Sequence, residues 1–85
     1  MTTEKIAELS VELDRVGALV LTETGQFEHL YAGHGKTLCG REVDNARVHV
    51  NDSYWECLKC RASRKSGGEW RAGRALRSEI AALSK

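Results

Sequence analysis

Apolar residues recur at helical spacing near both ends of the chain. In residues 2–16 they stand three or four positions apart, with charged residues between them, which predicts an amphipathic helix. Residues 69–84 show the same periodicity and predict a second helix. The apolar stripes are Ile6, Leu9, Leu13 and Val16 in the first helix and Ala72, Leu76, Ile80 and Leu83 in the second.

The stripe of the first helix has two interpretations. It can cover the core of the same chain, or it can form the seam of a homodimer, because its spacing is also that of a heptad repeat. Residues 2–16 hold only about two heptads, which are too few to identify a coiled coil. The covering helix is therefore favoured, and the homodimer is the alternative.

Residues 27–39 predict a β-hairpin. The centre of this stretch contains two glycines, which can adopt the positive φ angles of a tight turn. With the turn centred on His34, His29 stands opposite Cys39, and directly opposed residues have Cβ atoms about 5 Å apart. The hairpin thus places an imidazole beside a thiol. The same register pairs Tyr31 with Thr37 and Leu30 with Leu38.

Length and cysteine content favour a metal as the staple of this protein. The chain has 85 residues, one domain at most (residues 1–85), and its three cysteines cannot all pair as disulfides. A domain of this size buries only about 60% of its unfolded surface, so its core is marginal without a staple. No apolar run reaches the roughly 18 residues that span a membrane, and no secretory signal opens the sequence. We therefore expect a cytoplasmic protein without membrane association.

The cysteines and two histidines have the spacing of a zinc site within residues 27–60. Two residues separate Cys57 from Cys60, a gap that lets both sulfurs reach one metal ion. Together with Cys39 and one imidazole they complete a tetrahedral shell for Zn²⁺. The hairpin register favours His29 as the fourth ligand over His34, which lies at the loop tip, about 10 Å from Cys39 along the ribbon.

Other uses of the cysteines are disfavoured. A thioredoxin-like redox pair needs a strand–helix–strand frame that the sequence does not show, and an iron–sulfur cluster normally needs four cysteines. A catalytic zinc keeps one position open for water, whereas four protein ligands fill this shell. No histidine has the glutamate of a zinc deaminase two residues after it. We therefore expect a structural zinc and no enzymatic activity.

The segments around the cysteines predict further short elements. Residues 18–22 are either the end of the first helix or a short buried strand, and residues 47–50 alternate as a half-buried strand does. A short helix is expected to begin near Cys57 and to reach Lys65. Trp55 is expected to pack in the core or against the zinc site.

The sequence resembles the small zinc-finger proteins of actinobacteria and their phages. The resemblance rests on His29-Leu30, on Leu38-Cys39-Gly40-Arg41, on Trp55 and on Cys57-Leu58-Lys59-Cys60-Arg61. It implies a zinc-binding module whose ligands are His29, Cys39, Cys57 and Cys60. The two flanking helices carry no part of it.

Charge is distributed unevenly along the chain. Residues 1–28 carry six acidic and two basic groups, a net charge of −4, whereas residues 57–85 carry two acidic and eight basic groups, a net charge of +6. Such a basic segment can contact phosphates, and arginine suits that role. The candidate contact residues are Arg61, Arg64, Lys65, Arg71, Arg74 and Arg77.

Three interpretations of this basic segment stay open. The first is a nucleic-acid-binding or transcription-regulatory zinc finger. The second is a protein-binding adaptor, or a phage-type inhibitor of a host protein, that acts through its helices. The third is a plain solvated surface, or internal pairing between the basic segment and the acidic first helix.

These patterns together predict a small α+β fold. Its centre is a zinc-stapled β-hairpin, zinc-ribbon-like or treble-clef-like, and the helices at residues 2–16 and 69–84 flank it.

Overall fold

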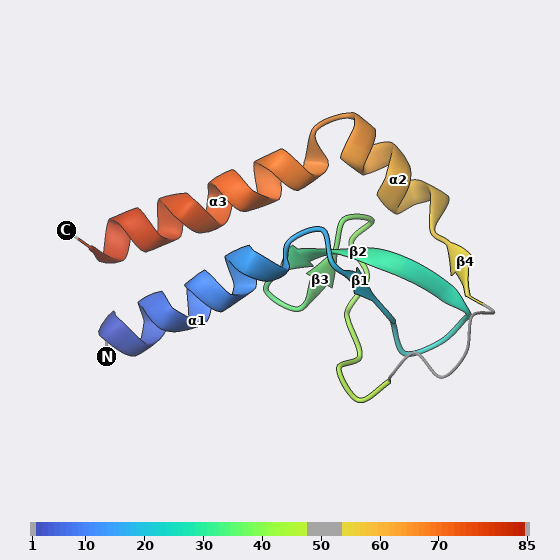
Figure 1. Cartoon of the computed structure of the whole chain (residues 1–85), viewed down its shortest axis with the longest axis horizontal. Coiled ribbons are helices and arrows are strands. Elements are labelled where there is room, and N and C mark those ends of the chain that lie inside the picture. Colours follow the sequence, from blue (N-terminus) through green and yellow to red (C-terminus); the bar gives the residue numbers. More distant parts are fainter. Residues whose placement is uncertain (1, 48–53, 85) are drawn as a thin grey trace.

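Three helices and four short strands make up the described part of the chain, a small α+β fold as predicted. The structure is a computed structural model that describes residues 2–47 and 54–84. The elements are α1 (Thr2–Arg15), β1 (Leu19–Val20), β2 (Phe27–Gly33), β3 (Lys36–Thr37), β4 (Trp55–Glu56), α2 (Leu58–Lys65) and α3 (Gly68–Leu83). In Figure 1, α1 and α3 form a two-helix arm beside the strands.

Strand β2 is the centre of the sheet, because β1, β3 and β4 all pair with it. β1 and β3 are antiparallel to β2, and β4 is parallel. The carbonyl groups of Gln26, Glu28 and Leu30 accept hydrogen bonds in succession along β2. Their donors are the amides of Trp55 (2.8 Å), Cys57 (3.0 Å) and Leu38 (2.8 Å). This ladder brings the segments before Cys39 and at Cys57 to neighbouring positions on one strand.

The β2–β3 hairpin has the predicted register at its base. Tyr31 pairs with Thr37, as expected, but Gly33 pairs with Lys36, so the register shifts between these two pairs. The turn residues His34 and Gly35 have φ angles of 53° and 71°. Positive φ at both central positions is the requirement of a type I′ turn, the two-residue turn whose twist matches that of the strands. The centre of the turn therefore lies between His34 and Gly35.

Helix α1 packs against α3 more extensively than against the strands, in the antiparallel arrangement that Figure 1 shows. Leu9 of α1 and Leu76 of α3 are both buried. The expectation that the first helix covers the zinc core is therefore only partly right, since its main partner is the last helix. The homodimer through this helix stays a prediction.

Two glycines allow α3 to pack closely against β2 and against the segment that follows α1. A Cβ at Gly33 of β2 would lie 2.9 Å from Leu76 Cδ1 of α3, so the glycine lets the helix approach the strand. A Cβ at Gly17 would overlap the carboxylate of Glu69, at the start of α3. The absence of a side chain at both positions thus sets how closely α3 packs.

Three local expectations have clear outcomes. Residues 18–22 contain the strand β1 rather than an extension of α1. Trp55 is 71% exposed, so the prediction that it packs in the core or against the metal site is wrong. The strand predicted at residues 47–50 lies mostly outside the described residues. No helix among the described residues is long and apolar enough to span a membrane.

Candidate metal centre

Four side chains that can ligate a metal meet where β2, the β3 turn and the start of α2 come together. His29 lies in β2, Cys39 follows β3, Cys57 immediately precedes α2, and Cys60 lies in the first turn of α2. The candidate ligand atoms all lie within 4.8 Å of one another, close enough to hold one metal ion. Leu30 and Leu38 pack beside the cysteines. The cluster therefore sits in the core of the strand-bearing part of the molecule.

The spacing of the donor atoms fits a tetrahedral ion. His29 Nδ1 lies 3.4 Å from Cys39 Sγ and 3.6 Å from Cys60 Sγ. Bond lengths near 2.0 Å to nitrogen and 2.3 Å to sulfur place neighbouring ligand atoms of a tetrahedral zinc about 3.5 Å apart. One nitrogen and three sulfurs, all within 4.8 Å of one another, match the ligand set of structural zinc sites.

The turn around Cys39 orients its sulfur by hydrogen bonds. Thr37 Oγ1 lies 3.1 Å from Cys39 Sγ and also accepts a hydrogen bond of 3.0 Å from the amide of Arg41. The amide of Gly40 donates to the carbonyl of Thr37 at 2.9 Å, and Gly40 has a φ of 92°. Gly40 therefore provides the bend of the chain after Cys39. Thr37, which the sequence interpretation did not single out, holds the turn together.

Electrostatics favour the protonation states that a metal needs at two of the ligands. Burial, together with the nearby charge of Arg41, lowers the pKa of His29, which keeps the imidazole neutral. Burial raises the pKa of Cys39, but hydrogen bonds from Thr37, the other cysteines and the Arg41 amide outweigh it, so that this pKa is lowered overall. Metals bind the neutral imidazole and the thiolate.

At Cys60 the electrostatics favour the neutral thiol instead of the thiolate. Burial raises the pKa of its thiol to about 11, and the side chain is only 1% exposed. A buried thiolate is unfavourable unless positive charge lies beside it. The cluster therefore needs a cation to hold all three sulfurs in the ionised form, which a metal ion would provide.

His34 lies apart from the cluster. It occupies the β2–β3 turn, and its Nε2 lies 2.7 Å from Glu79 Oε2 of α3. The side chains of both residues are about half exposed. Of the two candidate histidines, the structure thus brings His29 and not His34 to the three cysteines.

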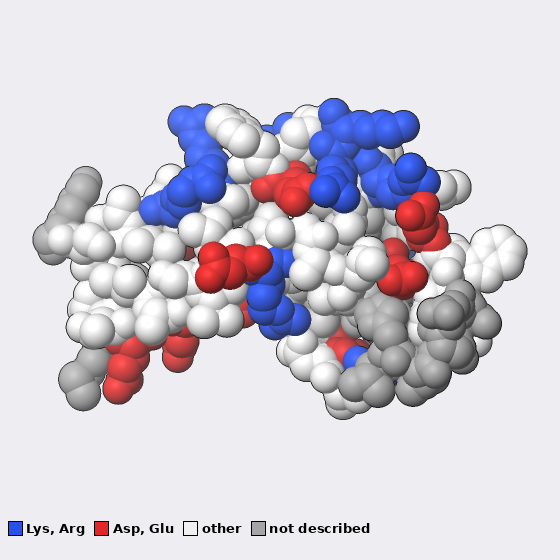
Figure 2. All heavy atoms as spheres, viewed as in Figure 1, with Lys and Arg blue, Asp and Glu red and all other residues white. Residues whose placement is uncertain are grey.

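The six predicted contact cations all lie on α2 and α3, and the side chain of Arg77 extends over Gly73 toward Leu13 of α1. Figure 2 shows Lys and Arg side chains along the edge that these helices form, with Asp and Glu over α1. We call the six residues the basic face: Arg61, Arg64, Lys65, Arg71, Arg74 and Arg77, all exposed.

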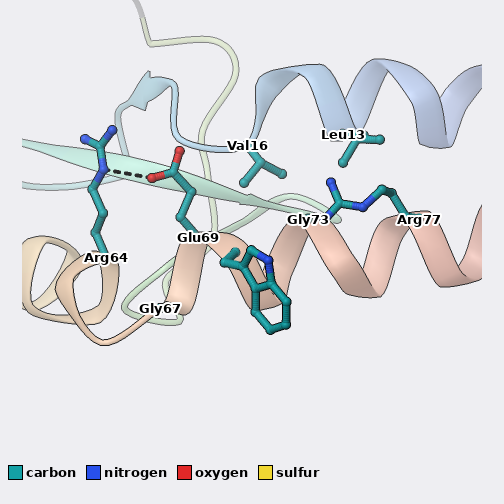
Figure 3. Close-up of a pocket in the computed structure, with 8 residues that line it drawn as sticks. Leu13, Val16, Arg64, Gly67, Glu69, Gly73 and Arg77 are labelled. Carbon is teal, nitrogen blue, oxygen red and sulfur yellow. Dashed lines mark ion pairs between the residues drawn. The ribbon is translucent and has the colours of Figure 1, made fainter.

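Two members of the basic face pair with carboxylates of neighbouring residues. Arg61 pairs with Glu56 at 2.6 Å, and Arg64 pairs with Glu69 at 2.7 Å, the ion pair that Figure 3 marks. The other four form no ion pair with a carboxylate of residues 2–47 or 54–84. Within those same ranges, no ion pair joins the basic face to the acidic helix α1. The internal pairing considered for these charges is therefore absent from this part of the chain.

A surface beside the cluster was missed in the sequence interpretation. A hollow of about 450 Å³ is lined by three of the candidate ligands and also by Phe27, Leu58, Arg41 and Lys59. Phe27 is 48% exposed and Leu58 is 74% exposed. The available signal was the period-two spacing of Phe27 and His29, which places both on one face of a strand.

Fold and site together define a small α+β protein, compatible with a zinc-ribbon-like fold, whose His/Cys₃ group is able to hold a metal ion. No family model, curated protein or solved structure matches the chain.

Proposed function

We propose that this protein is a non-enzymatic module that a structural zinc ion holds together and that binds nucleic acid through its basic face. The donor set supports the first part, because three sulfurs and one imidazole suit zinc and fill its tetrahedral shell. His29, Cys39, Cys57 and Cys60 would hold the ion. When bound, zinc would cross-link the strands to α2. The four protein ligands would leave no coordination position open.

The zinc part predicts that metal removal unfolds the strand-bearing part of the protein. The purified protein should contain one zinc per chain, and a chelator should reduce its far-ultraviolet circular dichroism, because metal-binding energy is folding energy in small domains. Metal content and circular dichroism are measured with and without chelator.

Two histidine variants locate the fourth ligand. His29→Ala should lose zinc or bind it much more weakly, whereas His34→Ala should keep it, because His34 contacts Glu79 away from the cluster. Zinc loss in His34→Ala but not in His29→Ala would contradict this assignment. A chelated protein with an unchanged spectrum would contradict the structural role of zinc.

The observation that carries the nucleic-acid part is the set of cations without carboxylate partners on one surface. Lys65, Arg71, Arg74 and Arg77 have no such partner among the described residues and are exposed. Arg74 lies with its guanidinium 5.3 Å from the centre of the Trp70 ring, which holds its position. A row of positioned arginines on adjacent helices suits the phosphates of a nucleic-acid backbone.

Salt dependence and charge removal test this contact. The affinity for a labelled oligonucleotide should fall linearly on logarithmic axes as salt increases. The triple variant Arg71→Ala/Arg74→Ala/Arg77→Ala should bind more weakly, and its salt slope should be smaller by about one for each phosphate contact removed. Fluorescence anisotropy at several salt concentrations measures both quantities.

Lys5→Ala is the matched control, because Lys5 is an exposed cation on α1 that pairs with Glu8. It should leave the affinity and the slope unchanged. If neither DNA nor RNA probes bind the zinc-loaded protein at low salt, the nucleic-acid part is wrong. A protein partner recovered in a pull-down that nuclease treatment does not affect would then support the adaptor function.

A further inference from the structure

The zinc cluster stands next to an exposed apolar surface on the same side of the sheet. Phe27 and Trp55 are partners in the parallel β2–β4 ladder, so their side chains lie on one face of neighbouring strands about 4.8 Å apart. Residues two positions apart in a strand share a face, so Phe27 lies on the face of His29, and Trp55 on that of Cys57. Leu58 follows Cys57 at the start of α2.

We call the two exposed rings, Phe27 and Trp55, together with the neighbouring Leu58, the aromatic face. Their side chains are 48%, 71% and 74% exposed. Large apolar side chains gathered at one exposed place mark a binding surface, whereas scattered ones need no explanation. Val11 and Leu19 are exposed singly on α1 and β1 and do not belong to this group.

The charges around the aromatic face fit an anionic partner. Arg41 and Lys59 line the same hollow as Phe27 and Leu58, and no carboxylate of residues 2–47 or 54–84 lines it. Helix α2 connects the two surfaces, because it begins with Leu58 and Lys59 and continues with Arg61, Arg64 and Lys65 of the basic face. The start of α2 therefore lies beside the aromatic face, and its later turns carry cations of the basic face.

We propose that the nucleic acid bound by this protein is single-stranded and that its unpaired bases stack on the aromatic face. The proposal rests on the proposed function and specifies its ligand. Bases in a duplex are already stacked on one another, whereas unpaired bases present their faces to aromatic side chains. Stacking accepts any base, so this surface selects single strands without selecting sequence.

The metal cluster sets the position of the aromatic face. His29 follows Phe27 by two residues, and Cys57 follows Trp55 by two residues. Both His29 and Cys57 belong to the metal cluster. An ion that fixes these two residues also fixes the spacing of Phe27 and Trp55 across the ladder. The module thus couples folding around the metal to the presentation of two rings.

A comparison of single-stranded and duplex probes tests the proposal on the zinc-loaded protein. The wild type should bind an oligothymidylate more tightly than a duplex of equal length. Trp55→Ala and Phe27→Ala should each weaken binding of the oligothymidylate about tenfold, the usual effect of losing one stacked base, and leave duplex binding unchanged. Val11→Ala removes an exposed apolar side chain from α1 and should change neither affinity.

Tryptophan fluorescence gives an independent measurement. The chain contains two tryptophans, so the variant Trp70→Phe leaves Trp55 as the single emitter. Addition of oligothymidylate should quench its emission, because a stacked base lies against the indole, and the duplex should not. In Trp55→Phe, emission from Trp70 should respond far less to the single strand.

The outcomes separate this proposal from the proposed function. If neither probe binds the wild type, the proposed function fails. If both probes bind equally and Trp55→Ala has no effect, the basic face binds nucleic acid but the stacking proposal is wrong. If sedimentation shows a dimer that Trp55→Ala converts to a monomer, the aromatic face binds a second copy of the chain, and the stacking proposal is overturned.

Discussion

Tyr31 connects three segments through a single buried hydroxyl group. Its ring is 1% exposed, its hydroxyl donates a hydrogen bond to the carboxylate of Glu12 in α1, and the amide of Gly35 donates to it at 3.0 Å. The guanidinium of Arg15 lies 4.5 Å from the centre of the ring. The side chain thus ties α1 and the hairpin turn to the middle of β2.

This environment predicts a loss of stability at alkaline pH. Burial, and next the hydrogen bond to Glu12, raise the pKa of Tyr31 above its ordinary value. Above about pH 10 the unfolded chain releases this proton while the folded chain still holds it, so the free energy of unfolding decreases as the pH rises. Denaturant unfolding of the zinc-loaded protein at neutral and alkaline pH measures the decrease.

Tyr31→Phe is the informative variant. It should be less stable at neutral pH by about 1–3 kcal/mol, because Glu12 and the Gly35 amide lose a buried partner. Its stability should also change less between neutral and alkaline pH than that of the wild type. Tyr54→Phe is the control and should keep the alkaline decrease. If the free energy of unfolding decreased equally in Tyr31→Phe and in the wild type at alkaline pH, the decrease would come from groups other than Tyr31.

At the scale of elements, α3 is positioned by glycines that differ in how much space surrounds them. Gly33 has a φ of 95°, and a Cβ there would lie 2.9 Å from Leu76 Cδ1. A Cβ at Gly73, within α3, would lie 3.5 Å from Arg77 Nη1 and 3.7 Å from Leu13 Cδ1, which are ordinary contacts. In Figure 3, the side chain of Arg77 lies over Gly73 toward Leu13.

Alanine substitutions at these glycines should have opposite effects. Gly33→Ala should destabilise the protein by more than about 1 kcal/mol, because the residue adopts positive φ and its Cβ would displace Leu76. Gly73→Ala should stabilise it by up to about 1 kcal/mol, because alanine favours the helix and fits the space. Denaturant unfolding measures both changes, and a destabilised Gly73→Ala would indicate tighter packing between α1 and α3 than the contacts here imply.

The elements with local signals were predicted best. The helices predicted at residues 2–16 and 69–84 begin and end within one residue of α1 and α3, because an apolar stripe defines a helix through its own spacing. The pairing of Tyr31 with Thr37 followed from the turn glycines. From this register the sequence placed His29 rather than His34 beside the cysteines, as the structure does.

Elements that depend on distant pairing were not predicted. β4 has two residues, too few for any periodicity, and it exists because it pairs in parallel with Phe27 and Glu28. Trp55 was expected to be buried because large aromatic residues usually are, but this pairing places it on an exposed face. The aromatic face could not be found without the ladder that creates it.

At the scale of the whole molecule, the charge asymmetry of the sequence becomes a separation of surfaces. α1 and α3 contact each other through buried Leu9 and Leu76, and no ion pair joins the basic face to α1 among the described residues. The acidic and basic segments therefore stay apart even though the helices that carry them are neighbours. This uneven distribution of charge would orient a polyanion, if one binds, toward the basic side.

The two ends of the helical arm also determine how the molecule responds to tension. The beginning of α1 and the end of α3 lie at the same end of the arm, away from the strands (Figure 1). A pull on these two ends would separate the helices from the tip inward and would reach the strands only after the arm has opened. The helical arm would thus keep tension at the chain ends away from the part of the protein that the zinc would hold.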